Sequence, residues 1–72
     1  MNIKLQEGMQ FKSIDGKHGE FTIRKVDYYG DNEPIWCGED DKFIFTLSEI
    51  VLSSYMPCVN GVWINEPNTY EE

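Results

Sequence analysis

The chain contains one histidine, His18, which lies close in sequence to a serine and an aspartate, the other two side chains of a hydrolytic triad. Ser13 and Asp15 precede it, and Gly16 and Gly19 flank it. A catalytic nucleophile needs a base held by a third group, together with an oxyanion site on rigid backbone. A glycine-flanked loop supplies neither of these, so the sequence predicts a solvated loop histidine and a protein that is not an enzyme.

Metal chemistry has equally little support in the sequence. There is no Cys-x-x-Cys and no His-x-x-x-His pair. Carboxylates could bind a hard cation through oxygen, but those that cluster here lack the spacing of a calcium loop. Cys37 and Cys58 each lie in an apolar stretch and are predicted to be reduced and packed as small hydrophobic residues. No glycine-rich phosphate loop is present. We expect no metal and no cofactor.

The clustered carboxylates have a second interpretation, as a surface for a basic partner. They lie on both sides of a short predicted strand, 35–37, and a strand rises about 3.3 Å per residue, which places the two clusters roughly 10–15 Å apart along one edge. A duplex presents several phosphates over that distance. The predicted partner-binding residues are these acids and nearby aromatics: Asp31, Glu33, Trp36, Glu39, Asp40, Asp41, Tyr29 and Tyr55.

The aromatic residues support this prediction but leave two alternatives open. The set of Tyr28, Tyr29, Trp36, Tyr55 and Trp63 is too large to be buried completely in a core of this size. Exposed tyrosine and tryptophan often anchor protein interfaces, and they also stack nucleotide bases. They could equally be ordinary residues of a β-barrel with their polar groups in water.

Charge narrows the class of partner. The 72-residue chain has a net charge of −7, and residues 27–72 contain ten acidic residues and one lysine. This charge repels nucleic acid and anionic membranes and favours encounter with a basic protein. No apolar run approaches the roughly 20 residues of a membrane span, and the first residues do not form a signal peptide. The sequence therefore predicts a cytoplasmic protein.

The longest β-type stretch, 20–29, organises the predicted fold. Phe21 and Ile23 alternate with polar residues, and the apolar positions resume at Val26, one step out of phase. One extra residue at Arg24–Lys25 would restore the alternation, so a β-bulge is predicted there. The other predicted strands are 3–5, 9–14, 35–37, 42–45 and those of a hairpin over 55–64.

Local motifs place the turns and the helix. Asn60-Gly61 between apolar residues predicts a tight hairpin turn. Thr46-x-x-Glu49 matches a capping box and predicts one helical turn that begins at Thr46. Residues 65–72 are polar and interrupted by proline. We therefore expect residues 1–66 to form one domain and residues 67–72 to be a flexible acidic tail.

The order of these elements resembles the SH3-like small barrel over roughly residues 8–56. The likeness is carried by Gly8-Met9-x-Phe11, Asp15-Gly16, Phe21-x-Ile23-x-x-Val26, Ile35-Trp36-Cys37 and Leu47-Ser48-Glu49-Ile50-x-Leu52. The chain looks like the short SH3-like proteins that bacteriophages and other mobile elements encode. The resemblance implies a mainly β fold of five or six antiparallel strands with one short helical turn and a C-terminal hairpin. The Ala-Leu-Tyr-Asp-Tyr box of peptide-binding SH3 domains is absent, so their proline-peptide groove is not implied.

These observations predict a non-enzymatic binding module that inhibits or modulates a basic host protein, with counter-defence as one context. One alternative is a nucleotide sponge, in which aromatic residues stack a small nucleotide and Lys12, Arg24 and Lys25 meet its phosphates. Another is a structural or accessory subunit of a larger assembly. A terminal hairpin with a free edge could also pair with a second copy and form a homo-oligomer.

Overall fold

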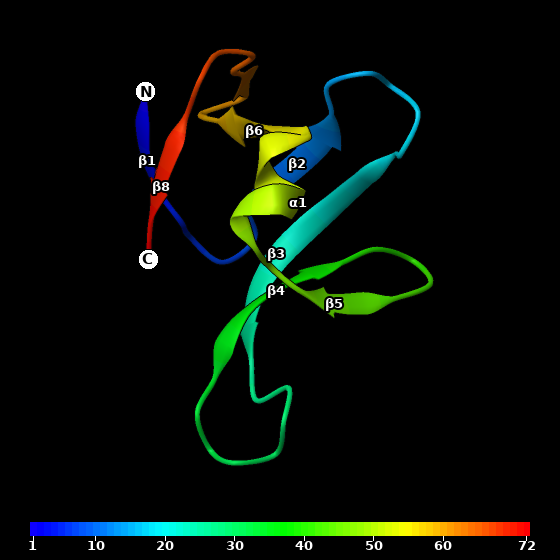
Figure 1. The fold of residues 1–72 in the computed structure, drawn as a ribbon, viewed down its shortest axis with the longest axis vertical. Coiled ribbons are helices and arrows are strands. Elements are labelled where there is room, and N and C mark those ends of the chain that lie inside the picture. Colours follow the sequence, from blue (N-terminus) through cyan, green and yellow to red (C-terminus); the bar gives the residue numbers. More distant parts are fainter.

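A computed structural model describes residues 1–72 as a mainly β domain (Figure 1). Six strands form one antiparallel sheet in the order β5-β4-β3-β2-β6-β7. Their bounds are Gln10–Ser13 (β2), Glu20–Val26 (β3), Ile35–Glu39 (β4), Ile44–Thr46 (β5), Tyr55–Val59 (β6) and Val62–Trp63 (β7). Helix α1, Glu49–Ser53, connects β5 to β6. The structure confirms the predicted mainly β fold, with five or six antiparallel strands expected and six found in the main sheet, one short helical turn and a C-terminal hairpin.

Aromatic rings form the centre of the core. Phe11 on β2 and Phe21 on β3 face each other across the ladder, and their rings are stacked with centroids 5.2 Å apart. Phe45 and Tyr55 meet the Phe21 ring edge-on at 5.2 and 4.8 Å. Such pairs add to the free energy gained from burying the rings. Phe21 therefore contacts partners from three other strands and connects the two halves of the sheet.

Gly38 lets one of these contacts form. A Cβ atom at this position would lie 2.5 Å from the Phe45 ring and 2.9 Å from the Phe21 ring. Because glycine has no side chain, Phe45 can lie across β4 and reach Phe21. This strand was predicted to end at Cys37, whereas in the structure it continues to Glu39. The close approach of two rings explains why a glycine belongs inside this strand.

The bulge predicted at Arg24–Lys25 is wrong. β3 and β4 pair without interruption from Thr22 opposite Glu39 to Val26 opposite Ile35. Lys25 lies opposite Trp36, and its ammonium lies 5.4 Å from the centroid of the indole ring. A lysine can cover apolar surface with its methylene chain while its charge stays in water. The strand pairing therefore continues through Lys25, although this residue is exposed and interrupts the pattern of buried residues.

The C-terminal hairpin forms as predicted, but the helix begins later than expected. Asn60 and Gly61 have φ values of 52° and 80°, the left-handed conformation that a tight hairpin turn requires. The N-cap of α1 is Ser48, whose Oγ accepts a hydrogen bond from the Val51 N–H at 3.3 Å. Thr46 instead ends β5, so the capping box starting at Thr46 is wrong. With five residues, this single helix is far too short to cross a bilayer.

The last residues of the chain are a strand and not the loose tail that the sequence suggested. β8, Thr69–Glu71, pairs in parallel with β1, Asn2–Lys4, in a small second sheet (Figure 1). The Leu5 N–H also donates to the Glu71 carbonyl at 2.8 Å. Tyr70 is half-buried, and its ring lies 5.8 Å from that of Phe11. The two ends of the chain therefore close one side of the core together.

Candidate functional site

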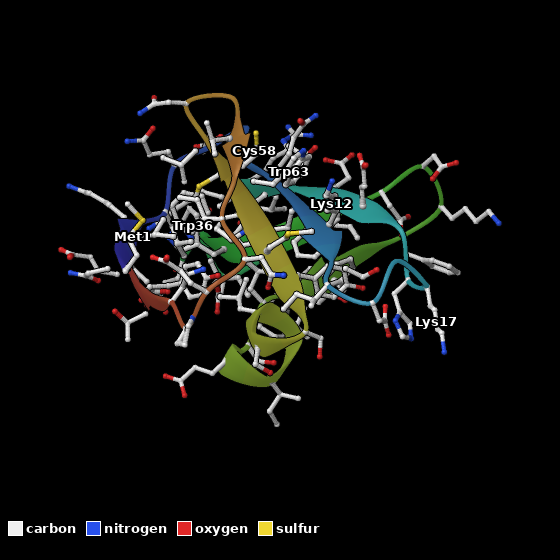
Figure 2. The ribbon with its side chains drawn as sticks, turned by 90° about the horizontal axis from the view of Figure 1, so that it is seen from above. Met1, Lys12, Lys17, Trp36, Cys58 and Trp63 are labelled. Carbon is white, nitrogen blue, oxygen red and sulfur yellow. The ribbon has the colours of Figure 1, made fainter.

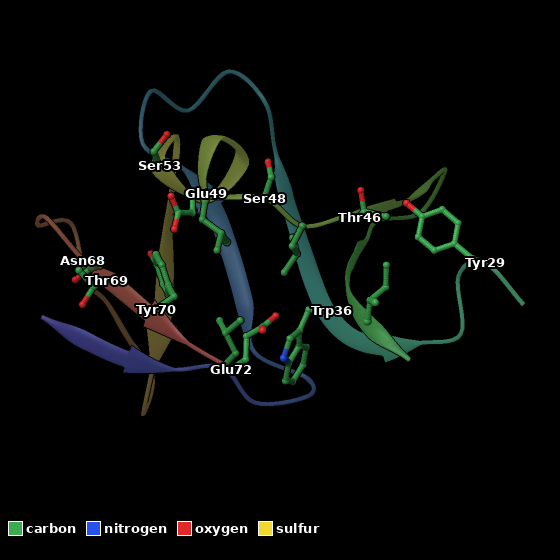
Figure 3. A pocket seen from close by; sticks show the side chains of 14 residues that line it. Tyr29, Trp36, Thr46, Ser48, Glu49, Ser53, Asn68, Thr69, Tyr70 and Glu72 are labelled. Atoms are coloured by element: carbon green, nitrogen blue, oxygen red, sulfur yellow. The ribbon is translucent and has the colours of Figure 1, made fainter. Parts of the chain in front are cut away.

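A hollow lies between helix α1, strand β4 and the C-terminal strand β8 (Figure 3). Its volume is about 910 Å³, within the range of about 300–1,000 Å³ typical of ligand sites. Apolar and polar side chains line it in equal number: Leu5, Tyr29, Ile35, Trp36, Thr46, Leu47, Ser48, Glu49, Leu52, Ser53, Asn68, Thr69, Tyr70 and Glu72. We call this hollow the α1–β8 pocket.

Two of the three aromatic residues predicted to bind a partner line this pocket. Tyr29 is 69% exposed, whereas Trp36 is 8% exposed. Tyr28, the neighbour of Tyr29, contacts its ring edge-on at 5.2 Å but does not line the pocket. Tyr55 is partly buried, packs edge-on against Phe21 at the core, and does not line the pocket. The pocket therefore combines one accessible tyrosine with one buried tryptophan.

Two residues that line the pocket each have one fully buried polar side-chain atom without a hydrogen-bond partner. One is Nε1 of Trp36, a donor, and the other is Oδ1 of Asn68, an acceptor. Leaving a buried polar group unpaired costs about 1–3 kcal/mol, so such groups are rare in folded proteins. Each of the two atoms has less than 1 Å² of accessible surface, so neither is open to a molecule in the hollow.

The charge of the pocket has one sign. Glu49 on α1 and Glu72 after β8 line it, and no lysine, arginine or histidine does so. Neither carboxylate has an ion pair within the chain. Burial raises the pKa of Tyr70 above its ordinary value of 10.0, and a side-chain hydrogen bond with Asn68 partly opposes this rise. The pocket is therefore suited to a cationic group with additional polar contacts.

Three of the five acids predicted to form a partner-binding edge instead form hydrogen bonds or an ion pair within the chain. Asp31 accepts a hydrogen bond from the Glu33 N–H at 3.0 Å. Glu39 forms an ion pair with Arg24 at 2.8 Å, which raises the pKa of the arginine. Asp40 accepts from the backbone N–H groups of Lys42 and Phe43 at 2.8 and 2.7 Å. These carboxylates stabilise turns or pair with a cation inside the chain.

The remaining two acids, Glu33 and Asp41, are exposed and form no ion pair or hydrogen bond through their carboxylates. They lie in different loops, one before β4 and one after it. β4 pairs on both sides, with β3 and with β5, so it is not the sheet edge that the sequence analysis assumed. The predicted acids therefore lie in loops at the two ends of an inner strand, and none of them lines the α1–β8 pocket.

The bonds to Asp40 predict a pH dependence of stability. Two backbone donors lower the pKa of this carboxyl below its ordinary value of 3.8. A group with a lowered pKa in the folded state stabilises the fold above its ordinary pKa, and this contribution is lost as the pH falls through the folded pKa. We expect Asp40→Asn to destabilise the protein near pH 6 and to make the loss of stability below about pH 4 less steep. Urea unfolding of both proteins between about pH 2 and pH 6 measures this, and two parallel curves would contradict it.

The basic residues proposed to meet nucleotide phosphates lie apart from the pocket. Arg24 is bound to Glu39, and Lys25 lies over Trp36. The Lys12 ammonium lies 4.4 Å from the centroid of the Trp63 ring (Figure 2). None of the three lines the α1–β8 pocket. The structure therefore does not bring the basic and aromatic parts of a nucleotide site together in this hollow.

The other chemistry-bearing residues occupy structural positions. Oγ of Ser13 accepts from the backbone N–H of His18 at 3.1 Å, and Asp15 lies 3.4 Å from the His18 ring. Cys37 is fully buried, and burial raises the pKa of its thiol. Cys58 is half-buried, and neither cysteine forms a disulfide. No three histidine, cysteine or acidic side chains are grouped so that they could bind a metal.

Sequence reasoning missed twelve of the fourteen lining residues; four of these are Glu49, Asn68, Tyr70 and Glu72. Three of these four belong to the segment interpreted as a flexible tail. A weak signal was present, because Thr69-Tyr70-Glu71 places one aromatic residue between two polar ones, the alternation of a short strand with one buried face. Three residues are too few to distinguish a strand from a polar tail.

Comparison with known proteins gives no relative of this chain. No protein-family model, no curated protein and no solved structure matches it.

Proposed function

We propose that this protein is a non-enzymatic binding module that acts in the cytoplasm and binds a basic protein through an acidic and aromatic surface. The observation that carries the proposal is the α1–β8 pocket, whose lining includes the aromatic side chains of Tyr29 and Trp36 and two carboxylates but no basic residue. The net charge of −7 adds long-range attraction for a basic partner. The free thiols of Cys37 and Cys58 are compatible with a reducing compartment.

A nucleic-acid-binding protein is the class of partner that this charge favours. Its basic groove is shaped for phosphates, and carboxylates on a small acidic domain can occupy such a groove in their place. Binding there would block the nucleic acid, so the module would inhibit or modulate its partner. Counter-defence in a bacteriophage is one setting in which an inhibitor of this kind is useful.

Three charge-matched double variants test the proposal. Glu49→Gln/Glu72→Gln neutralises the pocket, Glu33→Gln/Asp41→Asn neutralises the two free loop acids, and Glu7→Gln/Glu20→Gln neutralises exposed acids outside the pocket. Each double variant removes two negative charges, so the three variants have the same net charge. Each protein is used to capture partners from a bacterial lysate, and the affinity of any captured protein is then measured with purified components.

The expected result is a basic partner whose affinity falls at least tenfold in the pocket or loop variant and stays close to wild type in the control variant. Its affinity should also decrease as the salt concentration rises, because exposed charges are screened. Equal loss in all three variants would mean that net charge alone is responsible, and a partner without basic character or salt dependence would also overturn the proposal.

A further inference from the structure

Strand β5 is one of the two outer strands of the main sheet. Its neighbour in that sheet is β4, and Figure 1 shows no helix or strand beyond it on the other side. An outer strand leaves a row of main-chain N–H and C=O groups without partners in the sheet. Proline and bulges often protect such an edge, but β5 contains no proline and pairs with β4 without a bulge.

The hydrogen bonds to β4 show which residues of β5 face the free edge. Directly before β5, the Asp40 N–H donates to the Phe43 carbonyl at 3.0 Å, and directly after it, the Leu47 N–H donates to a carbonyl of β4 at 3.2 Å. Bonded and non-bonded residue pairs alternate along an antiparallel ladder. Ile44 and Thr46 are therefore in non-bonded pairs with β4, and their N–H and C=O groups point away from it. Neither residue forms a backbone hydrogen bond to a turn or loop.

Apolar side chains accompany these free main-chain groups. Ile44 is 41% exposed, and Phe43, directly before it, is 69% exposed. Ile44 and Thr46 project from the same face of the sheet, because alternate residues of a strand share a face. The edge thus combines main-chain donors and acceptors with apolar side chains. Protein modules that bind an extended segment as an added strand use this combination.

Charge at the two ends of β5 disfavours a second copy of this chain as the occupant. Before β5, Asp40 and Asp41 carry two negative charges against one positive charge of Lys42. After β5, Glu49 has no ion pair. Antiparallel pairing of two copies would bring the first end of one β5 next to the second end of the other, and both ends are net negative. A segment with basic residues at its two ends is complementary to this edge.

We infer that β5 receives an extended segment of the basic partner as an additional strand, which exchanges main-chain hydrogen bonds with Ile44 and Thr46. Apolar side chains of the segment contact Ile44 and Phe43, and its basic ends lie near Asp41 and Glu49. The edge adjoins the α1–β8 pocket, since Thr46 and Glu49 also line that pocket. This inference rests on the proposed function, because it names how the basic partner is held.

A synthetic peptide tests this pairing on the intact protein. Acetyl-Arg-Thr-Ile-Thr-Ile-Thr-Arg-amide has apolar residues at alternate positions and a basic residue at each end, and it is titrated into the ¹⁵N-labelled chain. We expect a dissociation constant in about the millimolar range. At about 90% saturation, exchange of the Ile44 and Thr46 amide protons with water should slow at least fivefold, because both become hydrogen-bonded. The Phe45 N–H, which faces β4, should be protected in both states.

Three altered peptides separate main-chain pairing from attraction between charges. A peptide with glutamate in place of arginine should bind at least tenfold more weakly. Two further peptides are N-methylated on the isoleucines or on the threonines, which removes donors from one or the other edge of the peptide strand. One of them should lose at least tenfold in affinity, and the other should bind like the parent. Equal binding of the two methylated peptides, or of the acidic peptide, overturns the inference.

Variants at one position of the protein give an independent test. Thr46→Pro removes an N–H that faces the free edge and leaves the bonds to β4 in place, so the sheet should be retained and the peptide should bind at least tenfold more weakly. Thr46→Ala keeps this N–H and should bind within about twofold of wild type. Circular dichroism checks the fold, and if Thr46→Pro unfolds, the methylated peptides decide the outcome on the wild-type chain.

Two further results would overturn the inference. One is an unchanged exchange rate at Ile44 and Thr46 when the parent peptide is added. The other is protection of both amides in the free protein together with a dimer in sedimentation, which would identify a second copy as the occupant of the edge.

Failure of this inference is distinguishable from failure of the proposed function. If the peptide leaves Ile44 and Thr46 unprotected while a captured basic partner depends on the pocket or loop acids, the inference is wrong and the proposed function stands. If the peptide binds as expected but no basic protein is captured, the edge binds extended chains and the proposed function is wrong.

Discussion

Replacing Phe21 by alanine is expected to lower the free energy of unfolding by about 3–5 kcal/mol. Phe21 is 4% exposed, and its ring contacts those of Phe11, Phe45 and Tyr55. Truncation leaves a cavity at the point where four strands meet. The neighbouring rings cannot move far to fill this cavity, because each belongs to a strand that is fixed by its own hydrogen bonds to the sheet. A domain of this length has a total stability of roughly 4–11 kcal/mol, so the variant should be partly or largely unfolded at 25 °C.

Circular dichroism with urea unfolding measures this loss, and Phe43→Ala provides the matched control. Phe43 is 69% exposed and lies in the loop before β5, so the same substitution there should change stability by less than about 0.5 kcal/mol. Similar losses in the two variants would contradict the position of Phe21 at the centre of the core.

Replacing Tyr70 by alanine is expected to cost about 2 kcal/mol and to weaken ligand binding in the α1–β8 pocket. This ring is half-buried and packs against Phe11, so its truncation should cost about half of what a fully buried aromatic residue costs. Because Tyr70 is the middle residue of β8, its loss should also loosen the pairing with β1 and one wall of the pocket.

Thermal melting measures the change, and a loss of 2 kcal/mol should lower the melting temperature by roughly 8–16 °C. Tyr70→Phe keeps the ring and is expected to melt close to wild type. If Tyr70→Ala melts as wild type does, the C-terminal strand contributes nothing to the fold, and the earlier expectation of a loose tail would be the better description.

The parts of the fold that short motifs encode could be predicted from the sequence. Asn60-Gly61 specifies a left-handed turn whatever surrounds it, and alternation at Phe21 and Ile23 specifies the buried face of β3. In contrast, the pairing of β1 with β8 joins residues 67 positions apart, and no local pattern reports such a contact. The bulge at Arg24–Lys25 was predicted wrongly because a hydrophobic pattern counts the charge of Lys25 and not its methylene chain.

The candidate site was predictable in part and for similar reasons. Composition identified Tyr29 and Trp36 as residues that contribute to a binding surface, and both line the pocket. Composition could not distinguish a carboxylate that accepts hydrogen bonds in a turn, such as Asp40, from a free carboxylate, such as Glu72. The difference depends on which backbone N–H groups lie within hydrogen-bonding distance. The pocket itself depends on the position of the C-terminal strand and was therefore not foreseen.

The parallel arrangement of β1 and β8 has a mechanical consequence. When residues before β1 and after β8 are pulled in opposite directions, the two strands are forced to slide along each other. All three residue pairs then resist at once, whereas an antiparallel hairpin pulled from its open end separates one pair at a time. The domain should consequently unfold abruptly when its two termini are pulled apart. The wall of the pocket that β8 forms would be lost at the same time.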